Sequence, residues 1–249
     1  MYIFSPLEQF EISLLLPIKF SQLNFSITNF AFFLFILFFL VLSLLSLSLY
    51  KTSLVPNGWQ ALKEMFYELT LGLVKDNIGR KGEFYFPFIY VLHTFLLACN
   101  LIGMVPYGFT LTSHIIFTFS LAFSIFFGIN MIGIKTHGVL FFNIFLPRDV
   151  PLVIVPLIIS IEIVSYTVKV FTLSIRLFAN MTSGHTLLKI VSGFSWTMLS
   201  KGGWLAIFHF VPLALLLILI ALELGIAILQ AYVFTLLTCI YLNDVLELH

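Results

Sequence analysis

The chain has 249 residues, of which 61% are hydrophobic and 9% are charged, and its formal net charge is +1. A soluble domain carries about 25% charged residues, so this composition excludes a water-facing surface and indicates an integral membrane protein. The apolar runs are about 20 residues or longer, which favours spanning helices over the roughly 10-residue alternating strands of a barrel. No basic cluster in the sequence points to nucleic acid.

The N-terminal half begins with an arm and a first span. Residues 1–28 lack a basic n-region and predict an ordered or interfacial arm rather than a cleaved secretory signal. Residues 29–50 are long enough to cross the hydrocarbon core as one helix. Residues 58–76 place apolar side chains at helical spacing, with lysines and glutamates between them. This pattern predicts an amphipathic helix on the membrane surface, and a soluble connector helix is the alternative.

Four apolar segments follow, and the last two are unusually long. Residues 84–105 and 113–134 predict two ordinary spans, whereas 151–199 and 204–242 would measure about 73 Å and about 58 Å as single helices. The hydrocarbon core is about 30 Å thick. Each long run therefore either breaks into two helices or lies steeply inclined, and we expect a tilted hairpin. The predicted fold is an all-α integral membrane protein with about five membrane-embedded helices and one interfacial amphipathic helix, in a single domain over 1–249.

Prolines and glycines mark where the long helices start and bend. Pro151 and Pro156 suit the first turns of a helix. Gly184 and Gly193 are places where the first long helix can bend, and Pro212 is a place where the second can kink. A steeply inclined helix spreads its residues laterally at mid-membrane depth, so we expect a partner to cover that flank.

The basic residues predict the orientation of the chain. Most of them lie in the connection between the first and second spans and in that between the third and fourth, which fall on one side if the spans alternate. The positive-inside rule places these connections on the cytoplasm-like side, with the N-terminus opposite and the C-terminus on the basic side. The residues concerned are Lys51, Lys63, Lys75, Arg80, Lys81, Lys135 and Arg148.

Polar residues follow one face of the first long helix. Glu162, Lys169 and Arg176 are spaced seven residues apart and Asn180 follows four residues later, and these steps keep one helical face. Ionisable residues inside a membrane are costly and are functional candidates by default. For Arg176 the alternative is a helix-end residue whose side chain reaches up to the membrane surface. His185 lies nine residues beyond Arg176, about half a turn away, and spacing does not decide which way it faces.

The second long helix carries a matching stripe. Glu223, Gln230 and Asp244 are separated by seven and fourteen residues, which again keeps one face. Two such stripes on adjacent helices predict a polar seam, and hence an ion path, inside an apolar protein. Cys99 and Cys239 both lie in apolar runs and are interpreted as small packing residues, and neither they nor the scattered histidines show the spacing of a metal site.

Four stretches resemble one known family. They are SPLEQFEI at 5–12, ACNLIGMVPYGF at 98–109, SIRLFANMTSGHTLLKI at 174–190 and ELGIAILQAYVFTLLTCIYLNDVLELH at 223–249. Over essentially its whole length the chain resembles the a subunits of F-type ATP synthases, in their mitochondrial form. Bacterial members exchange the histidine and acidic positions, and this sequence has the mitochondrial arrangement, His185 with Glu223.

The resemblance implies a function and its partners. The family's members are proton-translocating stator subunits of a rotary enzyme, without a catalytic site, cofactor or metal of their own. The implied partners are the c-ring of hairpin subunits, the peripheral stalk and other membrane subunits, the lipid bilayer and the transported protons, with no nucleic acid. The implied location is the mitochondrial inner membrane, as a multi-pass protein with its N-terminus on the intermembrane side and its C-terminus on the matrix side.

The resemblance also implies which residues carry the proton. Arg176 is the essential residue that separates two offset half-channels against the ring. From their positions along the helices, we expect His185 and Glu223 to serve the inlet path and Glu162 and Asp244 the outlet path. Three more residues join the proton path by the resemblance. They are Asn180 and Gln230, which hydrogen-bond near the arginine or order water, and Lys169, for which a structural pairing with Glu162 or Tyr166 is the alternative.

The residues are also compatible with two other functions. In a self-contained secondary transporter, Arg176 would be the counter-ion of an anionic substrate, but no internal repeat of the segment pattern supports this. In a passive scaffold subunit of a respiratory complex, the polar seam would be structural. No P-loop pattern occurs, as expected if nucleotide chemistry lies in other subunits.

Overall fold

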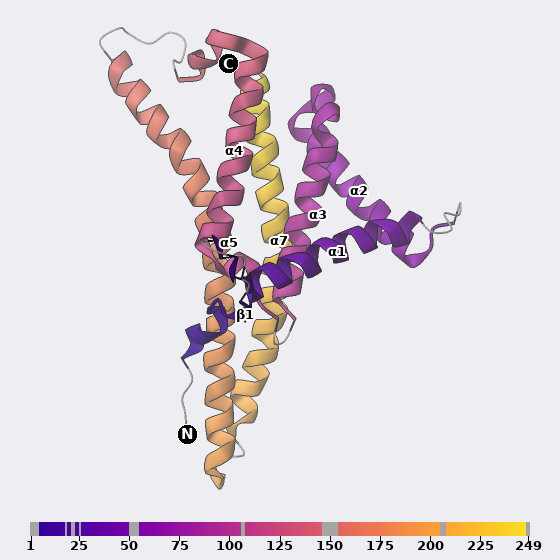
Figure 1. Ribbon diagram of the computed structural model, residues 1–249, viewed down its shortest axis with the longest axis vertical. Coiled ribbons are helices and arrows are strands. Elements are labelled where there is room, and N and C mark those ends of the chain that lie inside the picture. The colour runs from indigo at the N-terminus through magenta and orange to yellow at the C-terminus, as the bar shows by residue number, and fades with distance from the viewer. Residues whose placement is uncertain are drawn as a thin grey trace. The chain divides into compact units, whose positions relative to one another are not determined.

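The structure is a computed structural model of the chain (Figure 1). It describes residues 5–17, 19–20, 23–24, 26–49, 55–105, 108–145, 154–204 and 208–247. The elements in chain order are η1 (Pro6–Phe10), β1 (Leu14–Leu16), β2 (Lys19–Phe20), β3 (Leu23–Asn24), β4 (Ile27–Thr28), α1 (Asn29–Leu49), α2 (Gly58–Asn77), η2 (Gly79–Tyr85), α3 (Phe86–Gly103), η3 (Leu111–Ser113), α4 (Ile115–His137), η4 (Gly138–Phe145), α5 (Val155–Lys201) and α7 (Phe210–Leu246).

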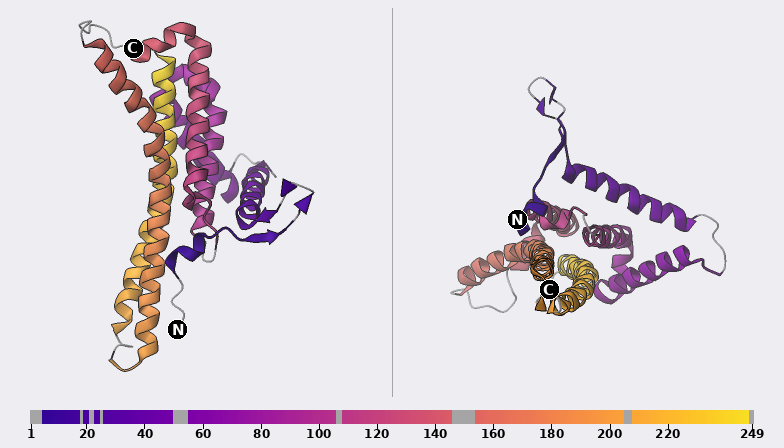
Figure 2. Two further views of the ribbon diagram at one scale, coloured as in Figure 1. Left: turned by 60° about the vertical axis from the view of Figure 1, so that its left-hand side comes forward. Right: turned by 90° about the horizontal axis from the view of Figure 1, so that it is seen from below.

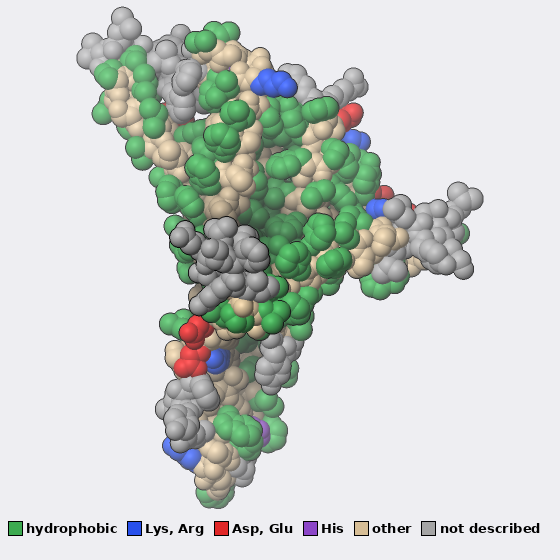
Figure 3. Space-filling view, viewed as in Figure 1, with side chains coloured by type: hydrophobic (Ala, Val, Ile, Leu, Met, Phe, Trp, Pro, Cys, Tyr) green, Lys and Arg blue, Asp and Glu red, His purple; other side chains and the backbone are tan. Residues whose placement is uncertain are grey.

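Five helical segments within the described residues are long and apolar enough to cross a membrane. They are Asn29–Ser46, Gly82–Gly103, Ile115–Phe141, Val155–Lys201 and Phe210–Leu246. The predicted class, an all-α membrane protein with about five spans, is therefore confirmed. In the space-filling view, apolar side chains cover most of the described surface on the visible face (Figure 3), as expected for a surface that meets lipid.

The two long helices are each continuous. α5 runs unbroken through Gly184 and Gly193 and measures about 70 Å, and α7 measures about 55 Å. The alternative in which each run breaks into two helices is therefore wrong. Pro212 does not interrupt α7, because the helix begins at Phe210 and the amides of a first turn have no intrahelical acceptor to lose. The inclination of both helices to the membrane stays a prediction.

The described residues fall into two compact units, and unit 1 contains the N-terminal arm. It comprises Met1–Leu42, Leu97–His114 and Leu177–Gln230. In the arm, β1 pairs antiparallel with β4 and β2 with β3, short ladders that the sequence pattern did not predict. The Thr28 hydroxyl accepts a hydrogen bond from the Ala31 amide (3.3 Å) and so caps the start of α1.

Within unit 1, the C-terminal half of α5 and the N-terminal half of α7 lie side by side (Figures 1 and 2). The end of α3 packs against this pair, since the buried Asn100 donates a hydrogen bond to the Ala227 carbonyl of α7 (3.0 Å). The buried apolar side chains here include Leu111, Leu177, Met181 and Ala227.

Unit 2 comprises Ser43–Leu96, Ile115–Arg176 and Ala231–His249. In it α3, α4 and the C-terminal part of α7 pack side by side (Figure 2). Helices α4 and α7 approach closely at Gly133, where an added Cβ would lie 2.4 Å from Val245 Cγ1. Small residues at such crossings let membrane helices pack tightly. The buried His93 lies with its Nδ1 3.3 Å from the Thr235 hydroxyl, which links α3 to α7.

Candidate functional site

Two polar pairs join α5 to α7 inside unit 1. Asn180 Nδ2 donates a hydrogen bond to Gln230 Oε1 (3.1 Å), and His185 Nε2 lies 3.5 Å from Glu223 Oε1. As the residue number rises along α5 the partner's number falls along α7, which is the pattern of antiparallel helices. The two stripes expected from the sequence therefore face each other in this unit, and His185, whose direction spacing left open, lies against Glu223.

Glu223 occupies an unusual position for a carboxyl group. Its residue surface is 5% exposed, and neither of its carboxyl oxygens has a hydrogen-bond partner among the described residues. The 3.5 Å to His185 Nε2 is longer than an ordinary hydrogen bond. A buried carboxyl without partners is costly in its charged form. Such a group is suited to take up and release a proton rather than to hold a permanent charge.

Gly184 makes the space that the Glu223 side chain fills. A Cβ added at Gly184 would lie 2.7 Å from Glu223 Oε1, 3.0 Å from its Cδ and 3.3 Å from its Cγ. Side-chain carbon atoms essentially never approach heavy atoms closer than 3.0 Å. The residue before His185 is thus small because the carboxyl of the facing helix lies directly against it, which gives this glycine a reason other than flexibility.

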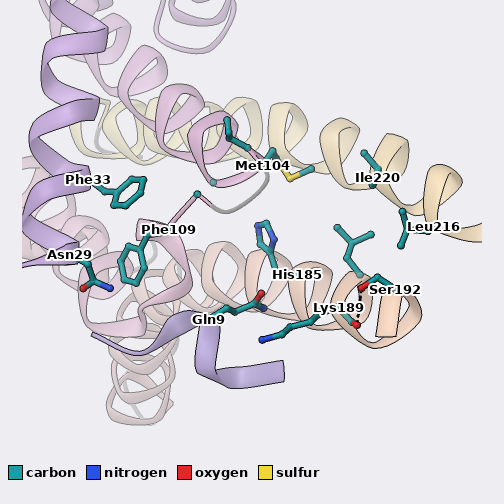
Figure 4. A pocket seen from close by; sticks show the side chains of 14 residues that line it. Gln9, Asn29, Phe33, Met104, Phe109, His185, Lys189, Ser192, Leu216 and Ile220 are labelled. Carbon is teal, nitrogen blue, oxygen red and sulfur yellow. Dashed lines mark hydrogen bonds between the residues drawn. The ribbon is translucent and has the colours of Figure 1, made fainter. Parts of the chain in front are cut away.

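A cavity of about 890 Å³ leads to His185 in unit 1. Figure 4 shows the imidazole pointing into this space, with Gln9 and Lys189 on one side and Met104 and Phe109 on others. Its lining residues are Gln9, Asn29, Phe33, Gly103, Met104, Val105, Gly108, Phe109, His185, Leu188, Lys189, Ser192, Leu216 and Ile220. The imidazole that lines this cavity is the one that lies 3.5 Å from the buried Glu223 carboxyl.

Lys169 and Asp244 form a separate pair in unit 2. Lys169 Nζ lies 3.9 Å from Asp244 Oδ2, and their side chains are 31% and 51% exposed. The same ammonium lies 5.6 Å from the centre of the Tyr166 ring and 5.2 Å from that of Tyr241, so aromatic faces surround it. The sequence offers Glu162 and Tyr166 as partners of Lys169, and the structure adds Asp244. Glu162 is half-buried on the same helix.

Arg176 lies on α5 in unit 2 and is exposed there. The neighbouring Ser174 and Leu177 are buried, so the arginine points away from the interior of the chain. A guanidinium on an apolar surface of this kind is costly toward lipid.

Sequence reasoning missed two residues that support the site. Asn100 is 0% exposed and holds the Ala227 carbonyl of α7, four residues beyond Glu223. The sequence does indicate Asn100, because it is a single amide residue in the middle of an apolar span. Gly184 was considered as a bend, whereas its role is to leave room for the carboxyl. No sequence signal reports a close approach between two helices.

No metal site is found in the part of the chain that the structure describes. Within those residues no group of three or more His, Cys, Asp or Glu side chains is arranged to hold an ion. Cys99 and Cys239 are both buried as free thiols.

The chain is similar to a large set of known proteins. The model of the family described as "ATP synthase A chain" matches residues 30–243. A protein named "ATP synthase subunit a" from Chondrus crispus is 69% identical over 98% of this chain and 97% of its own length. Proteins of the same name from Marchantia polymorpha and Paramagnetospirillum magneticum (strain ATCC 700264 / AMB-1) are 51% and 43% identical, each over 98% of this chain and 99% of their own.

Proposed function

Because the chain belongs to the ATP synthase A chain family, we propose that it is the proton-translocating stator subunit of a rotary ATP synthase. In this role it is a non-catalytic membrane subunit that offers protons a path to and from a rotating ring of carboxyl-bearing hairpins. The observation that carries the proposal is the cavity ending at His185, whose ring lies 3.5 Å from the buried Glu223 carboxyl. The arrangement places an access space, a titratable ring and a buried carboxyl close to one another.

The inlet path is assigned to unit 1. A proton from the cavity reaches His185, passes to Glu223 and continues toward the ring, with the Asn180–Gln230 hydrogen bond next to this route on the same two helices. Proton transfer needs heavy atoms within hydrogen-bond reach or bridged by one water. The 3.5 Å between His185 Nε2 and Glu223 Oε1 lies slightly beyond that reach, so the transfer requires these two side chains to approach each other. The absence of a fixed partner on the Glu223 oxygens, within the described residues, leaves them available to the proton.

Arg176 is assigned the role of separator. A ring carboxyl that faces lipid is stable in its protonated form, since an ionised one is expensive there. Beside an arginine within about 4–6 Å the same carboxyl is stabilised as the anion. Arginine keeps its charge when buried, whereas lysine can lose its proton. The exposure of Arg176 on the chain's surface supports this assignment, because the guanidinium has to reach a partner subunit.

The outlet path is assigned to unit 2, where Glu162 and Asp244 are the proposed carriers. Asp244 is 51% exposed and lies 3.9 Å from Lys169, so its carboxyl is accessible from outside the chain and has a cation beside it. Each charge that crosses the full membrane potential gains about 2.3 kcal/mol per 100 mV. That driving force turns the ring only if protons cannot pass directly from inlet to outlet.

We also propose the partners of the protein, its membrane and its orientation. Its partners are the c-ring, the peripheral stalk and the other membrane subunits of the complex. Its location is the mitochondrial inner membrane, with the N-terminus on the intermembrane side and the C-terminus on the matrix side. The basic residues between the first two spans support this orientation through the positive-inside rule.

The deciding experiment is Arg176→Gln in the native membrane. Lys201→Gln is the matched control, because Lys201 is a cationic residue in the last turn of the same helix. After native-gel verification of assembly, we expect Arg176→Gln to abolish proton-driven ATP synthesis and to leave a passive proton leak once the soluble head is stripped off. We expect Lys201→Gln to retain synthesis. Synthesis that survives in Arg176→Gln would overturn the separator role.

A further inference from the structure

The first described residue of the N-terminal arm is hydrogen-bonded to α5. Lys189 Nζ donates a hydrogen bond to the Ser5 carbonyl (3.1 Å), across 184 residues of sequence. Lys189 lies four residues after His185, so both side chains share one face of α5. A hydrogen bond with a charged donor is about twice as strong as a neutral one. The lysine that attaches the arm therefore stands one helical turn from the titratable ring.

The arm is tied to α1 at its other end, through one asparagine. Asn29 Nδ2 donates to the Glu11 carbonyl (3.1 Å), and its Oδ1 accepts from the Ser13 amide (3.2 Å). The Asn29 amide also donates to the Ser13 carbonyl (3.1 Å). Three hydrogen bonds at one residue fix the position of a segment more firmly than a single hydrogen bond does.

Between its two attachments the arm has internal structure. η1 is a single 3₁₀ segment with proline at its start, and Ser5 and Glu8 form a capping box around it. Proline at this position reduces the conformations open to the free chain. The segment is therefore more rigid than an untied terminus.

The attachments and the middle of the arm all line the same cavity. Lys189, Asn29 and Gln9 are among the residues that enclose the space leading to His185, and Figure 4 shows Gln9 and Lys189 beside the imidazole. We propose that residues 5–13 are a strap that forms one wall of this cavity, and that Lys189 and Asn29 are the positioning residues that hold it there. This rests on the proposed function, since it assigns to the strap control over what reaches the inlet.

The strap has a physical purpose in that setting. A cavity of about 890 Å³ admits many waters, and without a wall it would open toward lipid or bulk solvent on the side of the arm. A wall held by the hydrogen bonds of Lys189 and Asn29 keeps the space narrow, while water and protons still pass. Loss of the Lys189 hydrogen bond is expected to raise the ratio of released to attached strap roughly ten-fold. This factor corresponds to the lower end of the free energy that a hydrogen bond to a charged group contributes.

The test measures access to the cavity rather than activity. Leu216→Cys places a thiol in the cavity wall on α7, and the two native cysteines are 1% and 0% exposed, so their background labelling is low. Labelling rates with a small methanethiosulfonate and with a bulky maleimide are compared in assembled complexes. The reporter is combined with Lys189→Met, which keeps the apolar stem but removes the donor, with Lys189→Arg, and with the control Lys201→Met.

We expect Lys189→Met to raise the maleimide rate about ten-fold and to change the rate of the small reagent much less. Lys189→Arg and Lys201→Met should resemble the unmodified chain. Equal maleimide rates in Lys189→Met and Lys201→Met overturn the strap. If Lys189→Met does not assemble, the double variant Ser5→Cys with Lys189→Cys, treated with a short bifunctional maleimide, replaces it: a cross-link within one chain supports the strap, and its absence overturns it.

The outcome is separable from that of the proposed function. Access to the thiol does not depend on Arg176, so the strap can stand even if Arg176→Gln retains ATP synthesis. Conversely, Arg176→Gln can abolish synthesis while the maleimide rates show no strap. The two failures appear in different measurements.

Discussion

Gly184 offers the sharpest test of the inlet geometry, because the smallest possible side chain there collides with the proposed proton carrier. In Gly184→Ala the new Cβ would lie 2.7 Å from Glu223 Oε1, whereas ordinary van der Waals contact begins at 3.4 Å. The carboxyl oxygen must therefore retreat by about 0.7 Å in a tightly packed environment. A displacement of about 1 Å at reacting groups can cost about 100-fold in rate.

We therefore expect proton-driven ATP synthesis in Gly184→Ala to fall about ten-fold, equivalent to about 1.4 kcal/mol. The matched control is Gly193→Ala, which lies in the same helix and has nothing within 4 Å of the added Cβ. Both substitutions gain the same helix propensity, about 1 kcal/mol, so a difference between them reports the contact with the carboxyl. Synthesis rates are measured in assembled complexes, together with passive proton flux after removal of the soluble head.

A double variant strengthens this test. Glu223→Asp shortens the side chain by one methylene group and should relieve the collision, so we expect Gly184→Ala to cost less in the Glu223→Asp background than in the native one. If Gly184→Ala and Gly193→Ala support equal rates, the packing of Gly184 against Glu223 does not limit proton transfer and the inlet assignment loses its geometric support.

Two further predictions concern unit 2. Gly133→Val should reduce assembled complex on native gels, because its Cβ would lie 2.4 Å from Val245 Cγ1 and overpacking costs about 1–3 kcal/mol; Gly128→Val, in the same helix with open space, is the control, and equal yields would contradict the close crossing. Lys169→Met should lower ATP synthesis less than Asp244→Asn, since an exposed ion pair contributes about 0–1 kcal/mol whereas Asp244 is a proposed carrier. Equal losses in these two variants would show that the pair matters rather than the carboxyl.

The class of fold was predictable because lipid imposes few solutions. In a bilayer every backbone polar group must be satisfied internally, so long apolar runs become helices, and the spans expected from the sequence correspond to the helices observed. The continuity of α5 through its two internal glycines was not predictable. Glycine permits a helix to bend without requiring it, and packing against neighbouring helices determines whether the bend forms. The effect of Pro212 likewise depends on where α7 begins, which the sequence does not record.

The sequence by itself determined the membrane class, the two polar stripes and, through the RLFAN and GH motif, the family. These follow from composition and from spacing along single helices, which are local properties. Only the tertiary structure decided which members of the stripes meet: Asn180 with Gln230, His185 with Glu223, and Lys169 with Asp244. It also decided that the beginning of the arm contacts Lys189. The reason is physical, because the register of two packed helices and the path of a terminal arm depend on contacts between residues far apart in the chain, and no periodicity records them.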